Sequence, residues 1–330
     1  MEEKFEKIYN EILKLNIDEL ESLKWKTQKE KNAPLVTLAT SIILGIIIYV
    51  VMIILYNKGI VSVLGFRMVT IILLGIICIS AGCLVAEQTE YKTYHQYRKS
   101  FKQKIIKPMF ESLNENLRYY PDSSIGIIEH SEFRAEKYDG FYSEDILVGN
   151  IGNLKVKMGE VSTQEEFYDR DRNKSEKKIF EGLFATIEIP KKIETELYIR
   201  KQFQQDLKDM KIEMDSGEFK DLFYVYSPDK IKTFELLTSD FMEFLVDYRK
   251  KIKIEFDITI KNNFIYMRFH TGEIKYQSGM SYRIHAGSMF EPPETDKEIV
   301  DKENLYHDYA IFYVCLQMIN KIATRIVNAI

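Results

Sequence analysis

The sequence predicts an α+β protein in which a two-helix transmembrane hairpin is followed by a cytoplasmic domain with a mainly antiparallel sheet and flanking helices. Three observations support this prediction. Two stretches near the N-terminus, residues 35–56 and 68–86, contain no charged residue. Basic residues flank the outer ends of both stretches. Beyond residue 120 the apolar residues begin to alternate with polar ones, as they do in half-buried strands.

Composition and charge exclude several classes of protein. The 330 residues are 45% hydrophobic and 29% charged, which is typical of a folded chain and not of a disordered one. Three cysteines are too few for a disulfide framework or a multi-cysteine zinc site. Residues 108–330 contain 31 basic and 40 acidic residues, so this part lacks the basic excess that phosphate neutralisation requires. We therefore expect no nucleic acid partner.

Residues 1–34 are expected to form an N-terminal cytoplasmic amphipathic helix. Its apolar residues fall near helical spacing, at Phe5, Ile8, Ile12, Leu15, Leu20 and Leu23. A membrane-surface helix and a coiled-coil partner are the alternatives. The segment carries 7 basic and 8 acidic residues, without the cationic excess of a surface binder, which favours packing on the protein's own body.

Residues 35–86 are expected to form the transmembrane hairpin. At about 1.5 Å per residue, the spans 35–56 and 68–86 reach ~33 Å and ~28 Å, against a hydrocarbon core of ~30 Å. Basic residues concentrate outside the hairpin, at Lys24, Lys26, Lys29, Lys31, Lys92, Arg98, Lys99, Lys102, Lys104 and Lys107. The positive-inside rule then predicts a multi-pass protein with both termini in the cytoplasm and the lipid bilayer as a partner.

Small residues recur at every fourth position in both spans. They are Thr37, Ser41 and Gly45 in the first span, and Cys78, Gly82 and Ala86 in the second. Such faces let two helix backbones approach closely, so these residues are the candidate helix-pairing face. The alternative, that small residues are simply common in membrane helices, stays open.

Residues 87–119 predict a helical stalk with a bend at Pro108, and residues 120–330 predict the cytoplasmic α+β domain. The stalk lysines either set the topology or also contact anionic lipid headgroups.

Within the domain, the alternation at Leu154–Met158 predicts a strand after the turn-like residues 149–153. The other expected elements, in order, are a mobile polar loop over 162–178, a strand over 180–189 stopped by Pro190, a strand over 222–226, helices over 229–237 and 239–249, a hairpin of strands 252–260 and 264–270 with its turn at Asn262-Asn263, and an amphipathic helix over 302–328.

No catalytic, cofactor-binding or metal-binding residue is predicted. The five histidines lack metal-ligand spacing, and neither a phosphate-binding loop nor a nucleophile elbow is present. One loop is a candidate interaction site, because Met289, Phe290, Glu291 and Pro292 place apolar side chains beside a rigid double proline. In the alternative interpretation the loop folds over the sheet and Phe290 is a buried plug.

Several short motifs stand out along the chain: Phe180-Glu-Gly-Leu183-Phe184, Ser216-Gly-Glu-Phe219, Phe223-Tyr-Val-Tyr-Ser227, Leu236-Leu-Thr-Ser-Asp-Phe241-Met242 and Phe290-Glu291-Pro292. Together they resemble a bacterial membrane family known as domain of unknown function 3137. The resemblance covers roughly residues 87–295 and implies location in a bacterial cell membrane. It implies no activity. In some genomes, members of this family look like neighbours of LemA-type membrane proteins. The resemblance therefore implies a LemA-type protein as one expected partner.

These observations favour a membrane-anchored cytoplasmic protein-interaction or scaffold module without catalytic activity. The alternative is a membrane-tethered enzyme that acts on a lipid or a cell-envelope precursor. An enzyme is expected to have a pocket with convergent polar groups. A binding module is expected to have an exposed apolar patch or an open sheet edge.

Overall fold

The computed structural model describes residues 1–57, 75, 92–134, 136–168, 174–271, 274–275, 281–282, 290–293 and 298–329. The chain divides into two compact units, which are described separately. Unit 1 comprises Met1–Tyr9, Ile106–Phe290 and Lys302–Ile330, and unit 2 comprises Asn10–Ile105 and Glu291–Asp301.

Unit 2 is mainly helical. Helix α1 runs from Glu2 to Asn57 and therefore includes the whole uncharged stretch 35–56 in helical conformation. The described helical residues 92–101 lead into a π-helical turn, η1, at Lys102–Ile106. Lys104 forms an ion pair with Glu19 of α1, which joins the two helical segments.

The predicted irregularity near Pro108 takes the form of this π-helical turn. The short helix α3, Lys107–Glu111, follows it with Pro108 in its first turn. A proline is tolerated there because the first N–H groups of a helix have no intrahelical partner.

One helix among the described residues is long and apolar enough to cross a membrane by length and composition, namely α8, Lys302–Ala329. Half of its most apolar window is buried inside the protein, so α8 is only weak evidence for membrane association. The second expected span, 68–86, lies outside the described residues except for Gly75. The two-helix hairpin therefore stays a prediction.

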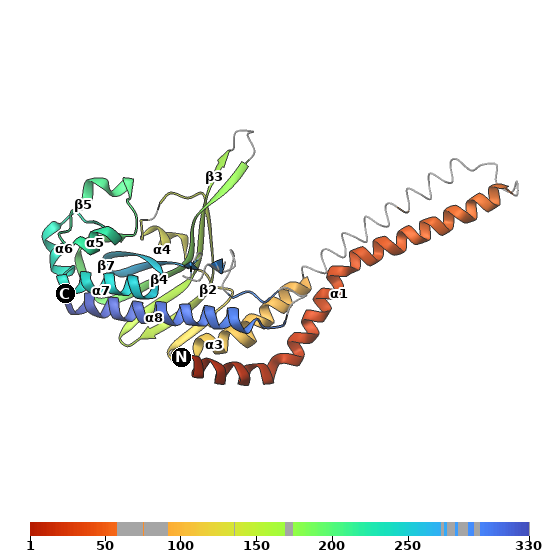
Figure 1. Cartoon of the computed structure of the whole chain (residues 1–330), viewed down its shortest axis with the longest axis horizontal. Helices are drawn as coiled ribbons and strands as arrows, with labels where there is room; N and C mark the ends of the chain where they lie inside the picture. Colours follow the sequence, from red (N-terminus) through yellow and green to blue (C-terminus); the bar gives the residue numbers. More distant parts are fainter. Residues whose placement is uncertain are drawn as a thin grey trace. The chain divides into compact units, whose positions relative to one another are not determined.

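Unit 1 confirms the predicted α+β class, with a seven-stranded sheet whose strand pairs are all antiparallel (Figure 1). The strand order is β1-β2-β3-β4-β6-β5, with β7 paired to β4 on its other side. The strands are β1 (Leu117–Tyr120), β2 (Gly140–Ile151), β3 (Leu154–Tyr168), β4 (Lys174–Arg200), β5 (Lys211–Ile212), β6 (Tyr224–Tyr226) and β7 (Glu255–His270). A separate pair is formed by β8 (Ile274–Lys275) and β9 (Ser281–Tyr282).

The chain reverses direction near Asn262-Asn263, as the sequence predicts, because Asp257 and His270 are hydrogen-bonded at 2.8 Å, whereas an extended strand would hold them about 43 Å apart. Residues 255–270 form one continuous strand, β7, which pairs along its length with β4. Asn262 has a positive φ of 57°, and the pairing register with β4 shifts beside it, so the two asparagines form a bulge at which β7 bends back. The bulge moves the apolar side chains of β7 from even positions before it to odd positions after it.

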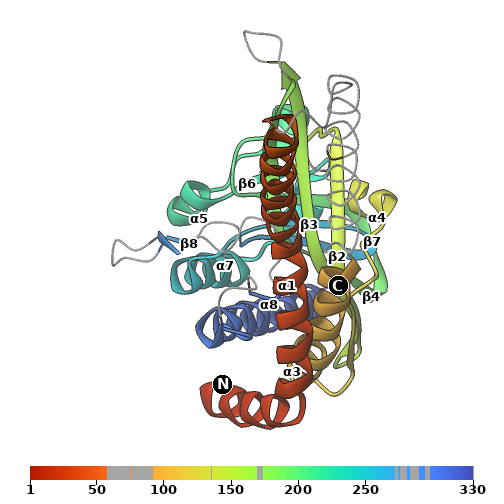
Figure 2. The ribbon, with the colours of Figure 1, turned by 90° about the vertical axis from the view of Figure 1, so that its right-hand side faces the viewer.

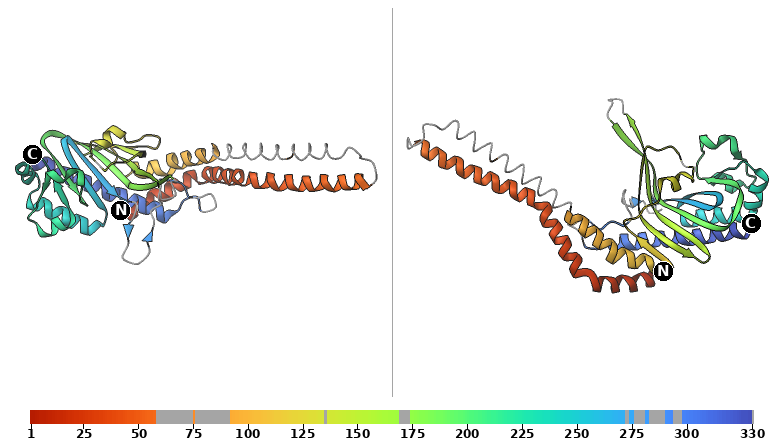
Figure 3. Two further views of the ribbon diagram at one scale, coloured as in Figure 1. Left: turned by 90° about the horizontal axis from the view of Figure 1, so that it is seen from above. Right: turned by 180° about the vertical axis from the view of Figure 1, so that it is seen from behind.

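Two expectations about β4 are wrong. Pro190 does not stop the strand, because it lies in the register shift between Glu188 and Ile193, where no ladder hydrogen bond is needed. The polar segment expected as a loop is largely strand. After Gln164 in β3 and before Leu183 in β4, the two strands have no other pairing partner among the described residues. Residues 165–168 and 174–177 therefore form a two-stranded ribbon that projects from the sheet (Figures 1 and 3).

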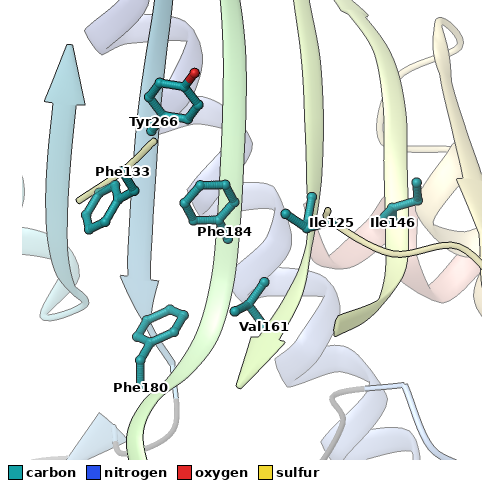
Figure 4. Close-up of a cluster of buried hydrophobic side chains, with 7 residues drawn as sticks. All are labelled: Ile125, Phe133, Ile146, Val161, Phe180, Phe184 and Tyr266. Atoms are coloured by element: carbon teal, nitrogen blue, oxygen red, sulfur yellow. The ribbon is translucent and has the colours of Figure 1, made fainter. Parts of the chain in front are cut away.

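The two faces of the sheet are covered differently. Helix α8 packs against β4 and β7, and α7 (Ser239–Ile252) lies beside it, with Arg325 over the Phe244 ring and Lys321 over the Tyr248 ring (Figure 2). On the opposite face, α4 (Ile127–Ser131) and the segment that follows it cover a cluster of buried side chains (Figure 4). These are Ile125, Phe133, Ile146, Val161, Phe180, Phe184 and Tyr266. The remaining helices are α5 (Gly217–Leu222), α6 (Lys230–Leu236) and the 3₁₀ turn η2 (Gln205–Met210).

The N-terminus of the chain is part of the core of unit 1. The Phe5 ring is fully buried and contacts the rings of Tyr306 and Tyr309 on α8. Lys302 at the start of α8 forms an ion pair with Glu6, 2.8 Å away. The first turns of α1 therefore stabilise the folded body.

Candidate functional site

Charged side chains are buried on the face of the sheet that α4 covers. We call Arg200, Arg268, Asp257, His270 and Glu136 the arginine cluster. The two arginines and Asp257 are 2%, 1% and 3% exposed. Because burying a charge is costly unless it is paired and hydrogen-bonded, the contacts of each side chain decide what the cluster can do.

Arg200 is held almost entirely by neutral oxygen atoms. Its guanidinium donates to the carbonyl oxygens of Ile258 (2.6 Å) and Phe133 (2.8 Å) and to the hydroxyl of Thr259 (2.8 Å). It also lies 4.2 Å from the centre of the Phe133 ring. Burial lowers the pKa of Arg200 to about 10, so the side chain stays charged at neutral pH. Arg200 thus ties the segment after α4 to two strands.

Arg268 pairs with Glu136, which lies between α4 and β2. Its Nη1 donates to Glu136 Oε2 at 2.8 Å, and Gln204 donates to the other carboxylate oxygen at 3.0 Å. Burial acts to raise the pKa of Glu136, but the charge and hydrogen bond of Arg268 outweigh it and lower this pKa from 4.5 to about 2. The Arg268 guanidinium also lies 4.0 Å from the centre of the Phe180 ring.

His270 and Asp257 form a hydrogen-bonded pair on β7. His270 Nε2 lies 2.8 Å from Asp257 Oδ2, and the backbone N–H of Lys201 donates to Asp257 Oδ1 at 2.7 Å. Burial acts to raise the pKa of Asp257, but His270 and the two arginines outweigh it and lower this pKa. Burial lowers the pKa of His270 despite its carboxylate partner. The neutral ring therefore donates its Nε2 proton to Asp257 and presents Nδ1 as an acceptor.

His130 on α4 lies in an aromatic surrounding beside this cluster. It is fully buried, and its ring lies 4.9 Å from that of Phe184 and 5.2 Å from that of Phe141. Its Nδ1 lies 3.2 Å from the Tyr138 hydroxyl. Burial, together with the charge of Arg268, lowers the pKa of His130 from 6.5 to about 3. His130 is therefore neutral in the folded protein at physiological pH.

A second group of charges could hold a metal ion. The carboxylates of Glu144, Asp145 and Glu160 are buried, and their oxygen atoms lie within 4.8 Å of one another. Glu144 and Glu160 face each other across β2 and β3, and Asp145 lies in the bulge of β2 with a φ of 57°. The Tyr119 hydroxyl donates to Asp145, and burial and this carboxylate raise the pKa of Tyr119.

Among the described residues of the candidate loop, Phe290 and Pro292 are buried and Glu291 is half-buried. The Phe290 ring is 1% exposed and packs against those of Phe110 (4.6 Å between ring centres) and Phe312 (5.5 Å) in unit 1. This placement favours the plug over the docking interpretation. In unit 2, Glu291 accepts a hydrogen bond from Arg98 Nε at 2.6 Å and lies 3.1 Å from Lys102 Nζ.

The other sequence-based candidates are only partly described. Pro292 is buried, whereas Met289 lies outside the described residues. Thr37, Ser41 and Gly45 lie in helix α1, while Cys78, Gly82 and Ala86 lie outside the described residues. The predicted helix-pairing face therefore stays a prediction.

Sequence reasoning missed the arginine cluster. The alternation along β7 indicated a half-buried strand, in which Asp257 and Thr259 would face solvent, but both are buried. A signal was present in the sequence, because an arginine and a histidine, Arg268 and His270, interrupt an otherwise apolar strand end. The sequence does not indicate which segment covers this face of the sheet, because the covering segment lies more than 100 residues earlier in the chain.

The fold and this site define an α+β domain with a seven-stranded antiparallel sheet. Helices α7 and α8 cover one face of the sheet, and α4 with the segment after it covers the arginine cluster on the other. Residues 178–323 match the family described as Protein of unknown function (DUF3137). This match confirms the family resemblance inferred from the sequence over these residues, which extend from β4 into α8. No curated protein and no solved structure matches the chain.

Replacing Phe290 with alanine is expected to destabilise unit 1. Truncating a fully buried phenylalanine removes its packing and leaves a cavity, at a cost of ~3–5 kcal/mol. The melting temperature of the purified chain should fall by several degrees. As a matched control, Phe167→Ala truncates a ring that is 45% exposed and should leave melting nearly unchanged. An unaltered melting curve for Phe290→Ala would contradict the plug interpretation.

Replacing His130 with phenylalanine is expected to flatten the acid side of the stability profile. Below pH ~6.5 the unfolded chain binds a proton at this histidine, and the folded chain does not until about pH 3. In the wild type, each pH unit below ~6.5 therefore costs up to about 1.4 kcal/mol. Melting temperatures measured between pH 7 and pH 4.5 should fall less steeply for the variant. The same substitution at exposed His95 is the control, and equal slopes for wild type and His130→Phe would refute the assignment.

Proposed function

We propose that this chain is a two-pass protein of a bacterial cell membrane whose body is a protein-interaction or scaffold module in the cytoplasm, without catalytic activity. The observation that carries the anchor is helix α1, which is helical through the uncharged stretch 35–56. Lysines precede this stretch, and further basic residues follow the second uncharged stretch, 68–86. By the positive-inside rule, this distribution orients both termini toward the cytoplasm.

The interaction part of the proposal rests on the β3–β4 ribbon. Two adjacent aromatic residues at its end, Phe167 and Tyr168, are 45% and 74% exposed. Aromatic side chains are enriched where proteins bind each other, because they supply a large contact area at low entropic cost. The backbone N–H of Glu166 is occupied by the Asp139 carboxylate at 2.9 Å, so the β3 edge is capped there. The exposed rings are therefore the better candidates for contact with a partner than the strand edge.

Replacing both rings with serine tests the interaction. Crosslinking in native membranes, followed by mass spectrometry, should recover a specific partner with the wild type, and the Phe167→Ser/Tyr168→Ser variant should lose it. The melting temperature should stay nearly unchanged, because both side chains are exposed. The control is Ile231→Ser on α6, where the side chain is 75% exposed. Recovery of the same partner by the double variant would remove the ribbon from the proposal.

Protease accessibility tests the topology. Protease added outside intact spheroplasts should leave residues 120–330 uncut, because the basic residues that flank the hairpin keep the body inside. In inverted vesicles the same protease should degrade the body. A cytoplasmic protein, checked in parallel, shows that the spheroplasts are intact. Cleavage of the body from the outside would exclude this topology.

A membrane-tethered enzyme that acts on a lipid or a cell-envelope precursor is the second candidate function. It is favoured by the His270–Asp257 pair, in which a buried carboxylate orients an imidazole as in general-base catalysis. A reaction would also require a substrate-binding group and a nucleophile or an activated water. Loss of a measured hydrolytic activity in His270→Gln, with retention of the crosslinked partner, would favour the enzyme.

A further inference from the structure

Arg268 has a buried hydrogen-bond donor that the cluster does not use. Its side chain is 1% exposed and its Nη1 is occupied by Glu136, but Nε has no hydrogen-bond partner among the described residues. The nearby Phe180 ring is a weaker acceptor than an oxygen atom. A buried donor without a partner in a native protein commonly marks the place of a water or an ion.

His270 offers a second unused group on the same face of β7. The two residues are two positions apart on the strand, so their side chains point to the same side of the sheet. Phe180 contacts both side chains, with its ring centre 4.0 Å from the Arg268 guanidinium and 5.1 Å from the centre of the His270 ring. Nε2 of the imidazole is bound to Asp257, and among the described residues Nδ1 has no hydrogen-bond partner. The His270 side chain is 18% exposed, whereas Arg268 Nε is fully buried.

We propose that Arg268 and His270 form a binding site for a small oxyanion of the carboxylate or phosphate class. An arginine edge matches two oxygen atoms of such an anion, and a protonated imidazole can donate to a third. A cation is disfavoured, because the carboxylate oxygens of Asp257 and Glu136 already accept hydrogen bonds. The site is independent of the proposed interaction function.

Binding at this site requires proton uptake. The charged groups that face it are Arg200 on β4, Lys201 after it, Arg268 and Asp257 on β7, and Glu136 from the segment before β2. Lys201 is paired with Glu255, 2.6 Å away, and the two arginines balance Asp257 and Glu136. An incoming anion adds negative charge to this balanced set. A proton on His270 Nδ1 compensates it and provides a hydrogen-bond donor.

Isothermal titration of the full-length chain with sulfate and with acetate tests the site. Both probes keep their charge between pH 6 and pH 8, so any pH dependence belongs to the protein. We expect binding at pH 6 that is at least tenfold weaker at pH 8. Titrations in two buffers with different ionisation heats should show the uptake of about one proton. Binding with equal affinity at both pH values, or no binding, would overturn the proposal.

Two variants and one spectroscopic readout locate the binding. His270→Gln keeps a donor for Asp257 but cannot take up a proton, so the affinity at pH 6 should fall to that at pH 8. Arg268→Gln should abolish binding, and His95→Gln is the matched control.

If a variant fails to fold, the wild type still decides, because histidine-selective NMR labelling reports on only five rings. Sulfate should shift the His270 resonance, and unmoved resonances would show that the Arg268 donor serves structure alone.

Discussion

The fold depends on one buried guanidinium, that of Arg200. It is hydrogen-bonded to carbonyl oxygens of Phe133 and Ile258, and Thr259 donates to the same Phe133 oxygen. These bonds fix the segment after α4 against β4 and β7. Removing the guanidinium would take away the side-chain donor of the buried Ile258 carbonyl, at a cost of about 1–3 kcal/mol, and would leave Thr259 as the only one of these two donors to Phe133. The arrangement of the covering segment, the packing of the Phe133 ring and the position of Glu136 all follow from this side chain.

The pairing of β4 with β7 decides which residues meet on that face. Side chains alternate along a strand, so a single extra residue exchanges the two faces. The bulge at Asn262 has this effect in β7, and it brings Asp257 and Thr259 to the same face as Arg268 and His270. A regular strand would have turned one of these pairs toward α8. At Gly182 the close approach of the two strands excludes a side chain, because a Cβ atom would lie 2.0 Å from the Phe269 carbonyl oxygen.

An aromatic cluster joins distant parts of unit 1. Phe110 contacts Phe290 and Phe312 with ring-centre distances of 4.6 and 4.9 Å, and Phe5 reaches Tyr309 on the same helix. The edge-to-face contacts of Phe110 with Phe290 and Phe312 are worth about 0.5–1.5 kcal/mol each beyond the area they bury. The residues come from the start, the middle and the end of the chain, so the body is closed by its own N-terminus.

The sequence by itself determined the local features of this protein. Hydrophobic periodicity identified α8, α7 and the strand at Leu154, because helical and strand spacing are properties of neighbouring residues. The α+β class followed from the same kind of information, and short local motifs carried the resemblance to the family that residues 178–323 match. The candidate loop was located as well, although the sequence left open whether Phe290 is exposed.

Tertiary structure alone decided the rest, because each remaining feature depends on a partner far away in the chain. Asn262-Asn263 is a common turn signal and β7 bends there, but the pairing of both halves of β7 with β4 depends on residues far away in the chain. Pro190 is compatible with β4 because a register shift removes the need for its hydrogen bond. Asp257, Arg268 and His270 are polar residues that local pattern assigns to solvent. Asp257 and Arg268 are buried, and His270 is half-buried, because Arg200 holds the segment around Phe133 over them. A contact across more than sixty residues leaves no local signal in the sequence.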